Sequence, residues 1–448
     1  MKRRRAATAR GRAVEALRGV LEKAERAAAL VPALARGLSP PDQDLLRELV
    51  LGVLRWKTAL DAEIAGASRI PLPKLAPNLR ETLEVALYQV RHLDRVPAYA
   101  AVNEAVEEAR ASGGEGAARL VNGVLRAIVK APAPVAPVAP PSPAAGGRGG
   151  LGESLARHYS HPAFLVARWL ERFGAERTRA ILEADNAPSR LDLLVNPRRI
   201  DRDGLRAALA AEGVDTEASP LAPLALTVLS GNPLRSKLFS SGAFSVQDVG
   251  SQVLPLLLPE GELLADLAAA PGGKSFSAVA HGRARRSVAL DRSWGRLRRV
   301  VENAERLGVP EVRPVAGDVA APPLPAGRFE RVLLDAPCSG TGTLRKIPEI
   351  RYRVTAAAIE RLAREQEEAL VAASELVATG GDLLYSTCSL EEEENERVVA
   401  RFLERSPGFA PAAIAAPPGL EPFVEGERLR LFPDASTDGF TAHLLHRR

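Results

Sequence analysis

The second half of the chain alternates short apolar runs with longer amphipathic segments, and this alternation constrains the fold more than any other feature. The apolar runs are ELLADL, SVALD, VRPVAG, RVLLD and DLLYS, and the amphipathic segments include SWGRLRRVVENAERLG and AAAIERLAREQEEALVAASELVA. Apolar runs of this length that alternate with helical periodicity predict parallel strands joined by helices. We therefore expect residues 246–448 to form a doubly wound, Rossmann-like α/β domain, whose ligand lies at the carboxyl ends of the strands.

Residues 1–130 show a different pattern, in which apolar side chains recur at spacings of three and four. Segments such as DQDLLRELVLGVLRW and LRETLEVALYQVRHL have it, and this spacing gathers apolar side chains on one helix face. An all-helical domain is therefore predicted.

Residues 131–150, APAPVAPVAPPSPAAGGRGG, contain almost no residues that could form a packed core and are predicted to be a linker. Residues 151–245 mix helical segments with strand-like runs such as RLDLLVNP and LALTVLS, and are predicted to be a small α+β domain.

The composition agrees with a folded protein of several domains. The chain has 448 residues, of which 46% are hydrophobic and 26% charged, and its formal net charge is +5. A positive balance favours a polyanionic partner such as nucleic acid. An Arg- and Ala-rich composition also arises from genomic base composition, so charge alone leaves both interpretations open.

Cysteine usage and the absence of long apolar runs indicate the compartment. Cys338 and Cys388 are the only cysteines of the chain, so neither a disulfide framework nor a cysteine-rich zinc site is expected. The N-terminal MKRRRAATARGR is not followed by an apolar stretch of the signal-peptide type, and no run of about 18 apolar residues occurs. We expect a cytoplasmic protein with no metal ion and no membrane span.

Small residues follow the first apolar run of the α/β domain, after Asp266. They are Ala268, Ala269, Ala270, Pro271, Gly272 and Gly273, followed by Lys274. Glycines let the backbone approach a ligand before a helix, which we expect to begin at about Ser275. The spacing matches neither the dinucleotide fingerprint nor a P-loop. The alternative is a tight turn between strand and helix that binds nothing.

Acidic residues end the next two apolar runs. Asp291 is placed to accept hydrogen bonds from the ribose hydroxyls of an adenosine ligand, although Ser293 and a helix follow directly and a helix cap is the alternative. Asp318 is placed to bond the adenine amino group, and its alternative is an ordinary turn. Because the ends of three strands carry suitable chemistry together, a ligand site is the favoured interpretation.

A polar loop, DAPCSGTG, begins at Asp335 directly after the run RVLLD. It contains Cys338, and although a buried cysteine is usually an inert small hydrophobe, a core position is less expected between proline and Ser-Gly. Four basic residues follow and are predicted either to contact phosphates or to form a solvated basic surface; they are Arg345, Lys346, Arg351 and Arg353.

The second cysteine, Cys388, ends the last apolar run in YSTCS and precedes LEEEENE. Ser389 and Glu392 have the spacing of a capping box, so a helix is expected to begin just after Cys388. The start of a helix favours a thiolate, whereas the adjacent carboxylates oppose it. Most of the acidic run is interpreted as a solvated helix face.

Taken together, these motifs closely resemble those of the ribosomal RNA small subunit methyltransferase B family, the Sun or Fmu type of RNA cytosine-5 methyltransferases. The resemblance covers nearly the whole chain and is carried by AAAPGGK, DAPCSGTGTLRKIPEIR, YSTCS with EEEENE, RHYSHPAFLVARWLERFG and FSVQDVGSQ. The helical part resembles that family's NusB-like RNA-binding domain in LVLGVLRWKTALD and RLVNGVLRAIV. Two positions depart from the family pattern. Ala268 stands where a cysteine is common, and the DGFF-like segment at residues 437–441 lacks one aromatic residue.

The resemblance implies a class I methyltransferase that uses S-adenosyl-L-methionine and forms 5-methylcytosine in 16S ribosomal RNA. It implies that residues 268–274 with Asp291, Asp318 and Asp335 bind the cofactor, and that the middle domain also binds RNA. It further implies that Cys388 attacks carbon 6 of the cytosine, that Cys338 assists product release and that Asp335 orients the base. A monomer is expected.

Three alternatives stay open. Cys338 belongs to a Pro-Cys pair, which supplies the nucleophile in DNA cytosine-5 methyltransferases. The substrate is transfer RNA in a second alternative, and in a third the protein is a non-catalytic RNA-binding factor in ribosome assembly.

Overall fold

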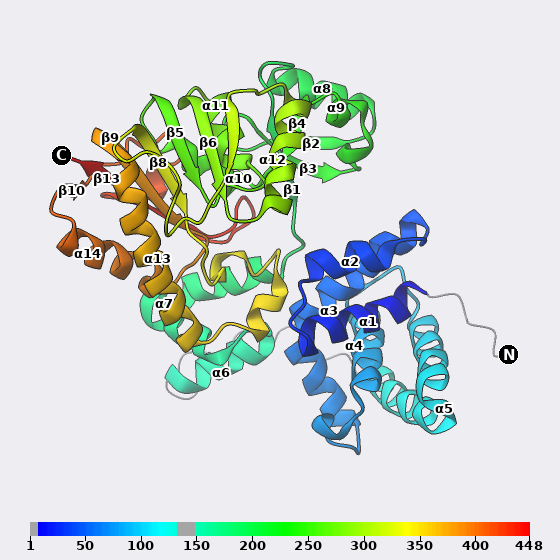
Figure 1. Ribbon diagram of the computed structural model, residues 1–448. Coiled ribbons are helices and arrows are strands. Elements are labelled where there is room, and N and C mark those ends of the chain that lie inside the picture. Colours follow the sequence, from blue (N-terminus) through cyan, green and yellow to red (C-terminus); the bar gives the residue numbers. More distant parts are fainter. Residues whose placement is uncertain (1–7, 132–147) are drawn as a thin grey trace. The chain divides into compact units, whose positions relative to one another are not determined.

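A computed structural model of the chain describes residues 8–131 and 148–448 (Figure 1). Most of the predicted linker therefore lies outside the described residues. The chain divides into two compact units. The N-terminal unit contains the chain up to Ala187 together with Leu344–Arg353, and the C-terminal unit contains Pro188–Thr343 and Val354–Arg448. This division by compactness does not follow the predicted domain boundaries, which remain a prediction.

The N-terminal unit is helical, as predicted. Its helices are α1 (Ala9–Glu22), α2 (Ala27–Ala35), α3 (Pro40–Ala67), α4 (Pro77–His92), α5 (Ala98–Lys130), α6 (Arg148–His158) and α7 (Ala163–Asn186), with short 3₁₀ turns η1 (Leu72–Lys74) and η4 (Pro348–Tyr352). Hydroxyl side chains cap two helix starts, because Thr8 accepts from the N–H of Gly11 and Ser39 accepts from that of Asp42.

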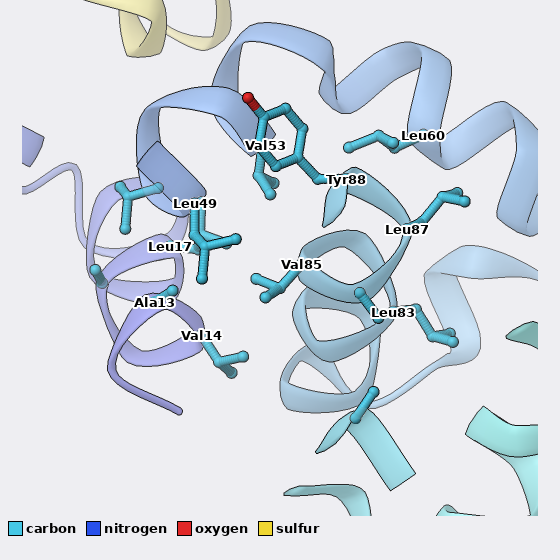
Figure 2. Close-up of a cluster of buried hydrophobic side chains, with 14 of the residues drawn as sticks. Ala13, Val14, Leu17, Leu49, Val53, Leu60, Leu83, Val85, Leu87 and Tyr88 are labelled. Atoms are coloured by element: carbon cyan, nitrogen blue, oxygen red, sulfur yellow. The ribbon is translucent and has the colours of Figure 1, made fainter. Parts of the chain in front are cut away.

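Figure 2 shows the core of this unit, in which Leu17 of α1, Leu49 and Val53 of α3 and Leu87 of α4 converge. Tyr88 packs over Gly52 of α3, where an added Cβ atom would lie 2.0 Å from the tyrosine ring. The glycine therefore permits the close approach of α3 and α4.

The C-terminal unit begins with a small antiparallel sheet in the order β2-β3-β1-β4. Its elements are β1 (Leu191–Val195), α8 (Arg202–Ala211), β2 (Asp215–Ala218), β3 (Ala225–Ser230), η2 (Pro233–Arg235), α9 (Lys237–Ser240) and β4 (Phe244–Val246). The strands expected in RLDLLVNP and LALTVLS are β1 and β3.

A larger sheet has the order β11-β12-β13-β9-β8-β5-β6-β7, with β10 pairing to β13. Its parallel strands are β5 (Gly261–Leu267), β6 (Ala284–Asp291), β7 (Val312–Ala316), β8 (Phe329–Asp335) and β9 (Val377–Thr387). The antiparallel edge contains β10 (Phe409–Pro411), β11 (Val424–Glu425), β12 (Arg428–Leu431) and β13 (Phe440–Arg447). The doubly wound α/β domain predicted from the alternating pattern is confirmed.

Helices cover this sheet, as the contacts of α11 with β5 and β6 and of α13 with β8 and β9 show (Figure 1). They are α10 (Val249–Leu256), α11 (Gly273–Ala280), α12 (Trp294–Leu307), α13 (Ala356–Leu376) and α14 (Glu396–Arg405), with 3₁₀ turns η3 (Thr341–Thr343), η5 (Glu392–Glu394) and η6 (Glu421–Phe423). Val332, Leu333 and Leu334 of β8 are fully buried, as expected for a central parallel strand with both faces covered. No helix among the described residues is long and apolar enough to cross a bilayer.

Candidate active site

The small-residue loop leaves β5 at the carboxyl edge of the large sheet. Ala268 and Gly272 both have positive φ angles, of 61° and 97°. An added Cβ atom at Gly272 would lie 2.8 Å from the ring of Phe276, so glycine meets both a conformational and a spatial requirement. Helix α11 begins at Gly273, slightly earlier than the predicted start at Ser275.

A cavity of about 320 Å³ opens beside this loop. Its lining includes Ala268 after β5, Asp291 at the end of β6, Gly317 and Asp318 after β7, and Pro337 after β8. The structure therefore brings Asp291 and Asp318 to the same hollow as the start of the small-residue loop. This is the position that parallel strands of a doubly wound sheet give to a ligand.

The two aspartates differ in their surroundings. Asp291 is buried, and its Oδ1 accepts hydrogen bonds at 2.8 Å from both the backbone N–H of Ser293 and the guanidinium of Arg296. Its Oδ2 accepts from the backbone N–H of Ala270 at 3.3 Å, which ties it to the small-residue loop. Ser293, not Asp291, caps α12, so the simple cap interpretation of Asp291 was wrong. Asp318 is half exposed, and its Oδ1 accepts from the N–H of Ala320.

An ion pair joins the loop to the end of β8. The Nζ of Lys274 lies 2.6 Å from Oδ2 of Asp335, and Oδ1 of Asp335 accepts from the hydroxyl of Ser386 at 3.0 Å. Burial disfavours the lysine cation, but the carboxylates of Asp335 and Asp266 outweigh it, and the pKa of Lys274 is raised. Burial raises the pKa of Asp266 to about 6, although Lys274 and a 2.7 Å hydrogen bond from Ser275 oppose that shift.

The two cysteines, 50 residues apart in sequence, meet at this edge. Their Sγ atoms are 3.1 Å apart, and both residues are partly buried and free of disulfide bonds. The N–H of Gly342 donates to the carbonyl of Cys388 at 2.9 Å, which further connects the two loops. The hydrogen bond with Cys388 and burial raise the pKa of Cys338 well above that of an ordinary thiol. Cys388 also contributes to the raised pKa of Lys274, so the ammonium group and Cys388 interact electrostatically.

The acidic segment after Cys388 differs from the prediction. It forms the short turn η5, and α14 begins only at Glu396. Ser389 Oγ accepts from the N–H of Glu391 instead of the N–H of Glu392 that a capping box requires. The expected helix start just after Cys388 was wrong, because the Ser389 hydroxyl also donates to the inward-pointing Glu394 and thereby holds the segment as a loop.

The same segment was wrongly interpreted as a solvated helix face. Glu391, Glu393 and Glu394 are all buried, and Glu394 and Asn395 are at most 1% exposed. Asn395 accepts from the hydroxyl of Thr387 and donates to the carbonyl of Ser389, so it is hydrogen-bonded to the residues before and after Cys388. Sequence reasoning missed both residues. The sequence contains one sign of this buried turn, because Asn395 interrupts the run of glutamates that follows the strand.

The basic residues after the Cys338 loop belong to the N-terminal unit. Arg345 and Arg351 are buried. The guanidinium of Arg351 donates to the carbonyl of Arg55 at 2.6 Å and to that of Asp185 at 3.0 Å. The predicted solvated surface is therefore wrong for both arginines, and Arg351 donates to backbone carbonyls instead of to a phosphate. Arg353 likewise donates to the carbonyl of Glu25 at 2.6 Å, and Lys346 is half-buried.

The residues that meet here combine several chemical functions within one edge of the sheet. There are two adjacent thiols, an ammonium group, several carboxylates and a cavity whose lining includes Asp291 and Asp318. Among the described ranges, no cluster of three or more His, Cys, Asp or Glu residues has a geometry that could hold a metal ion. The arrangement suits nucleophilic catalysis by a thiolate.

Comparison with known families divides the chain into three matched segments. Residues 253–446 match the family described as 16S rRNA methyltransferase RsmB/F. Residues 7–130 match the NusB family, and residues 161–235 match the ferredoxin-like domain of RsmF/B-like methyltransferases.

Individual relatives match over most of their length. A probable ribosomal RNA small subunit methyltransferase B from Bacillus subtilis is 34% identical over 90% of this chain and 90% of its own. One from Synechocystis is 36% identical over 82% of each chain. The crystal structure of the protein PH0851 covers all of both chains with a TM-score of 0.79 at 25% identity.

Proposed function

The chain belongs to the 16S rRNA methyltransferase RsmB/F family, and on that premise we propose that it methylates carbon 5 of a cytosine in 16S ribosomal RNA through a covalent bond from Cys388. The protein is an RNA methyltransferase by family. The observation that carries the finer proposal is the meeting of Cys388 and Cys338, 3.1 Å apart, beside the Lys274–Asp335 ion pair.

The cavity beside the small-residue loop fits S-adenosyl-L-methionine. Its volume of about 320 Å³ lies within the range of small-molecule sites. Asp291 and Asp318 supply carboxylate acceptors for adenosine hydroxyl and amino groups, and residues 268–274 with Asp335 form the rest of the binding set. When bound, this cofactor supplies the methyl group as an electrophile.

Cys388 makes carbon 5 reactive. Carbon 5 of cytosine is a poor nucleophile, and addition of the Cys388 thiolate at carbon 6 forms a C–S bond and an enamine whose carbon 5 accepts an electrophile. Once carbon 5 is methylated, its proton leaves to a solvent base in a release step that Cys338 assists. The C–S electron pair then returns to Cys388, and the ring regains its aromaticity. Asp335 orients the base, and Lys274 stabilises the negative charge on Cys388.

The surroundings of the two thiols support this assignment over the reverse one. A thiol that keeps its proton is a weak nucleophile, since only the thiolate attacks. The hydrogen bond with Cys388 and burial raise the pKa of the Cys338 thiol. Cys388 interacts electrostatically with the ammonium group of Lys274, which supports Cys388 as the attacking group and leaves Cys338 to act at product release.

A pair of cysteine variants separates the two roles. Cys388→Ala is expected to abolish methyl transfer and to form no protein–RNA adduct. Cys338→Ala is expected to retain attack and to accumulate the adduct, which denaturing gels detect as a slower band. Adduct in the first variant and none in the second would reverse the assignment.

Bisulfite mapping identifies the substrate. Total RNA from cells with and without the gene is sequenced after bisulfite treatment. We expect one cytosine of 16S ribosomal RNA to be protected from conversion in cells that have the gene and to be converted in cells that lack it. Loss of protection in transfer RNA alone would show that the substrate is transfer RNA. Unchanged protection in both RNAs, together with the failure of S-adenosyl-L-methionine to bind in calorimetry, would indicate a non-catalytic assembly factor.

A further inference from the structure

Glu394 lies at the centre of a hydrogen-bond network between the two cysteine loops. It is fully buried, although glutamate is rarely buried without charged or hydrogen-bonding partners. Its Oε1 accepts from the backbone N–H of Ser339 at 2.8 Å, and its Oε2 accepts from the hydroxyl of Ser389 at 2.5 Å. The Ser339 hydroxyl donates to the same Oε2. One carboxylate therefore holds the residue after Cys338 and the residue after Cys388.

Helix α13 supports the same carboxylate. The side-chain amide of Gln366 donates to Glu394 Oε1 at 3.0 Å and to the carbonyl of Pro337 at 2.9 Å. The hydroxyl of Tyr385 on β9 donates to the backbone carbonyl of Glu394 at 2.6 Å, which fixes the turn that carries it. Burial raises the pKa of Glu394, and the hydrogen bonds from Ser339, Ser389 and Gln366 oppose that shift.

The two loops depend on Glu394 to different degrees. The Cys388 loop is also held by Asn395, which donates to the carbonyl of Ser389 at 3.1 Å, and by Thr341, whose hydroxyl accepts from the N–H of Leu390 at 2.9 Å. The Cys338 loop keeps the hydrogen bond from Gln366 to the carbonyl of Pro337, but at Ser339 both the backbone N–H and the hydroxyl donate to Glu394. Loss of the carboxylate therefore loosens the Cys338 loop more than the Cys388 loop.

We propose that Glu394 is a positioning residue, which holds Cys338 beside Cys388 so that the covalent intermediate is released. This inference depends on the proposed roles of the two cysteines. Glu394 acts through Ser339 and does not transfer a proton itself. Its removal should impair release while leaving attack at carbon 6 largely intact.

The experiment compares Glu394→Ala and Glu394→Gln with the control Glu392→Gln in the full-length protein. Glu392 belongs to the same acidic run, but its side chain is 44% exposed and pairs with Arg397. Attack is measured with RNA that carries 5-fluorocytosine at the target, because fluorine replaces the proton that must leave and stops the reaction at the adduct. Release is measured as turnover, and as the fraction of enzyme linked to ordinary RNA at steady state.

For Glu394→Ala we expect turnover to fall by about tenfold or more. Trapping by 5-fluorocytosine should stay within about threefold of the unmodified protein, and the linked fraction on ordinary RNA should rise. Glu394→Gln should be intermediate, because its carbonyl still accepts from the Ser339 N–H, and its pH–rate profile should keep its shape. Glu392→Gln should match the unmodified protein. If the alanine variant does not fold, the glutamine variant still provides the comparison of trapping with turnover, its pH–rate profile and the comparison with Glu392→Gln.

Two results would overturn the proposal. If Glu394→Ala slows trapping by 5-fluorocytosine as much as it slows turnover, and if no adduct accumulates on ordinary RNA, Glu394 does not act on release. A glutamine variant as inactive as the alanine variant, with an altered acidic limb of the pH profile, would show that Glu394 transfers a proton. Failure of the underlying cysteine assignment has a separate signature, because Cys388→Ala would then still form an adduct.

Discussion

At the scale of single residues, the short motifs predicted the position of the site but not its internal contacts. Asp291, Asp335 and Cys388 were recognised because each stands at the end of an apolar run, and parallel strands end at one edge. Cys338 was recognised because it lies between proline and Ser-Gly in the polar loop that begins at Asp335. Glu394 was missed, because its burial depends on Ser339, which is 55 residues away in sequence. A glutamate within an acidic run carries no local sign of such a partner.

Gly272 offers a test of the small-residue loop. Gly272→Ala places a side chain at a φ of 97° and 2.8 Å from the ring of Phe276. We expect this change to shift the loop and to weaken S-adenosyl-L-methionine binding by about tenfold, as measured by calorimetry.

Gly282 provides the matched control for this change. It also has a positive φ, of 69°, but an added Cβ atom there meets nothing within 4 Å. Gly282→Ala should therefore show backbone strain alone and leave cofactor affinity unchanged. Equal loss of affinity in the two variants would mean that the contact with Phe276 does not shape the loop.

At the scale of elements, long periodic segments were predicted and short ones were not. The parallel strands and the helices between them follow from apolar runs and amphipathic periodicity. Strands such as β2, β4 and β11 were not foreseen, because segments of two to four residues are too short to show a period. Helix α14 was expected several residues too early, because the capping-box spacing at Ser389 competes with buried hydrogen bonds that only the folded chain forms.

Helix α4 contains a buried carboxyl group that makes the N-terminal unit sensitive to pH. Burial raises the pKa of Glu81 to about 7, against 4.5 for an ordinary glutamate. Above pH 7 the folded chain must hold this buried charge, whereas the unfolded chain hydrates it, so this contribution to stability falls as the pH rises from about 4.5 to 7. Glu81→Gln is therefore expected to stabilise the unit by about 1 kcal/mol at pH 8, after allowance for solvent screening, and by less at pH 5.

Urea unfolding followed by tryptophan fluorescence measures this change. Trp56 and Trp169 lie in the N-terminal unit and Trp294 in the other, so the signal reports mainly on the helices. Glu15→Gln, at an exposed position on α1, is the control and should leave the midpoint unchanged at both pH values. A larger stabilisation by Glu81→Gln at pH 5 than at pH 8 would contradict the assigned direction.

At the scale of the whole molecule, sequence order and spatial grouping differ in one segment. Leu344–Arg353 directly follows the Cys338 loop in the chain, yet it belongs to the N-terminal unit. Its Glu349 side chain accepts from the N–H of Ala27 at the start of α2. The sequence indicated a basic patch here, because arginines are usually exposed. No local pattern shows that an arginine of this segment donates to backbone carbonyls of α3 and α7.

Arg351 tests the contribution of this segment. Arg351→Ala leaves the carbonyls of Arg55 and Asp185 without their donor, and the loss of such buried hydrogen bonds is expected to destabilise the N-terminal unit by about 2–3 kcal/mol. The same fluorescence measurement detects it as a lower urea midpoint. Arg361→Ala removes an exposed arginine that pairs with Glu365 on α13 and should change stability by less than about 0.5 kcal/mol. Equal effects of the two variants would show that Arg351 does not hold the segment.

Mass spectrometry of a trapped complex tests the identity of the nucleophile most directly. The full-length protein is incubated with S-adenosyl-L-methionine and 16S ribosomal RNA that carries 5-fluorocytosine, digested with protease and nuclease, and searched for a peptide linked to a methylated fluorocytidine. We predict that the linked residue is Cys388. A link at Cys338, or methylated RNA without any cysteine adduct, would contradict the account.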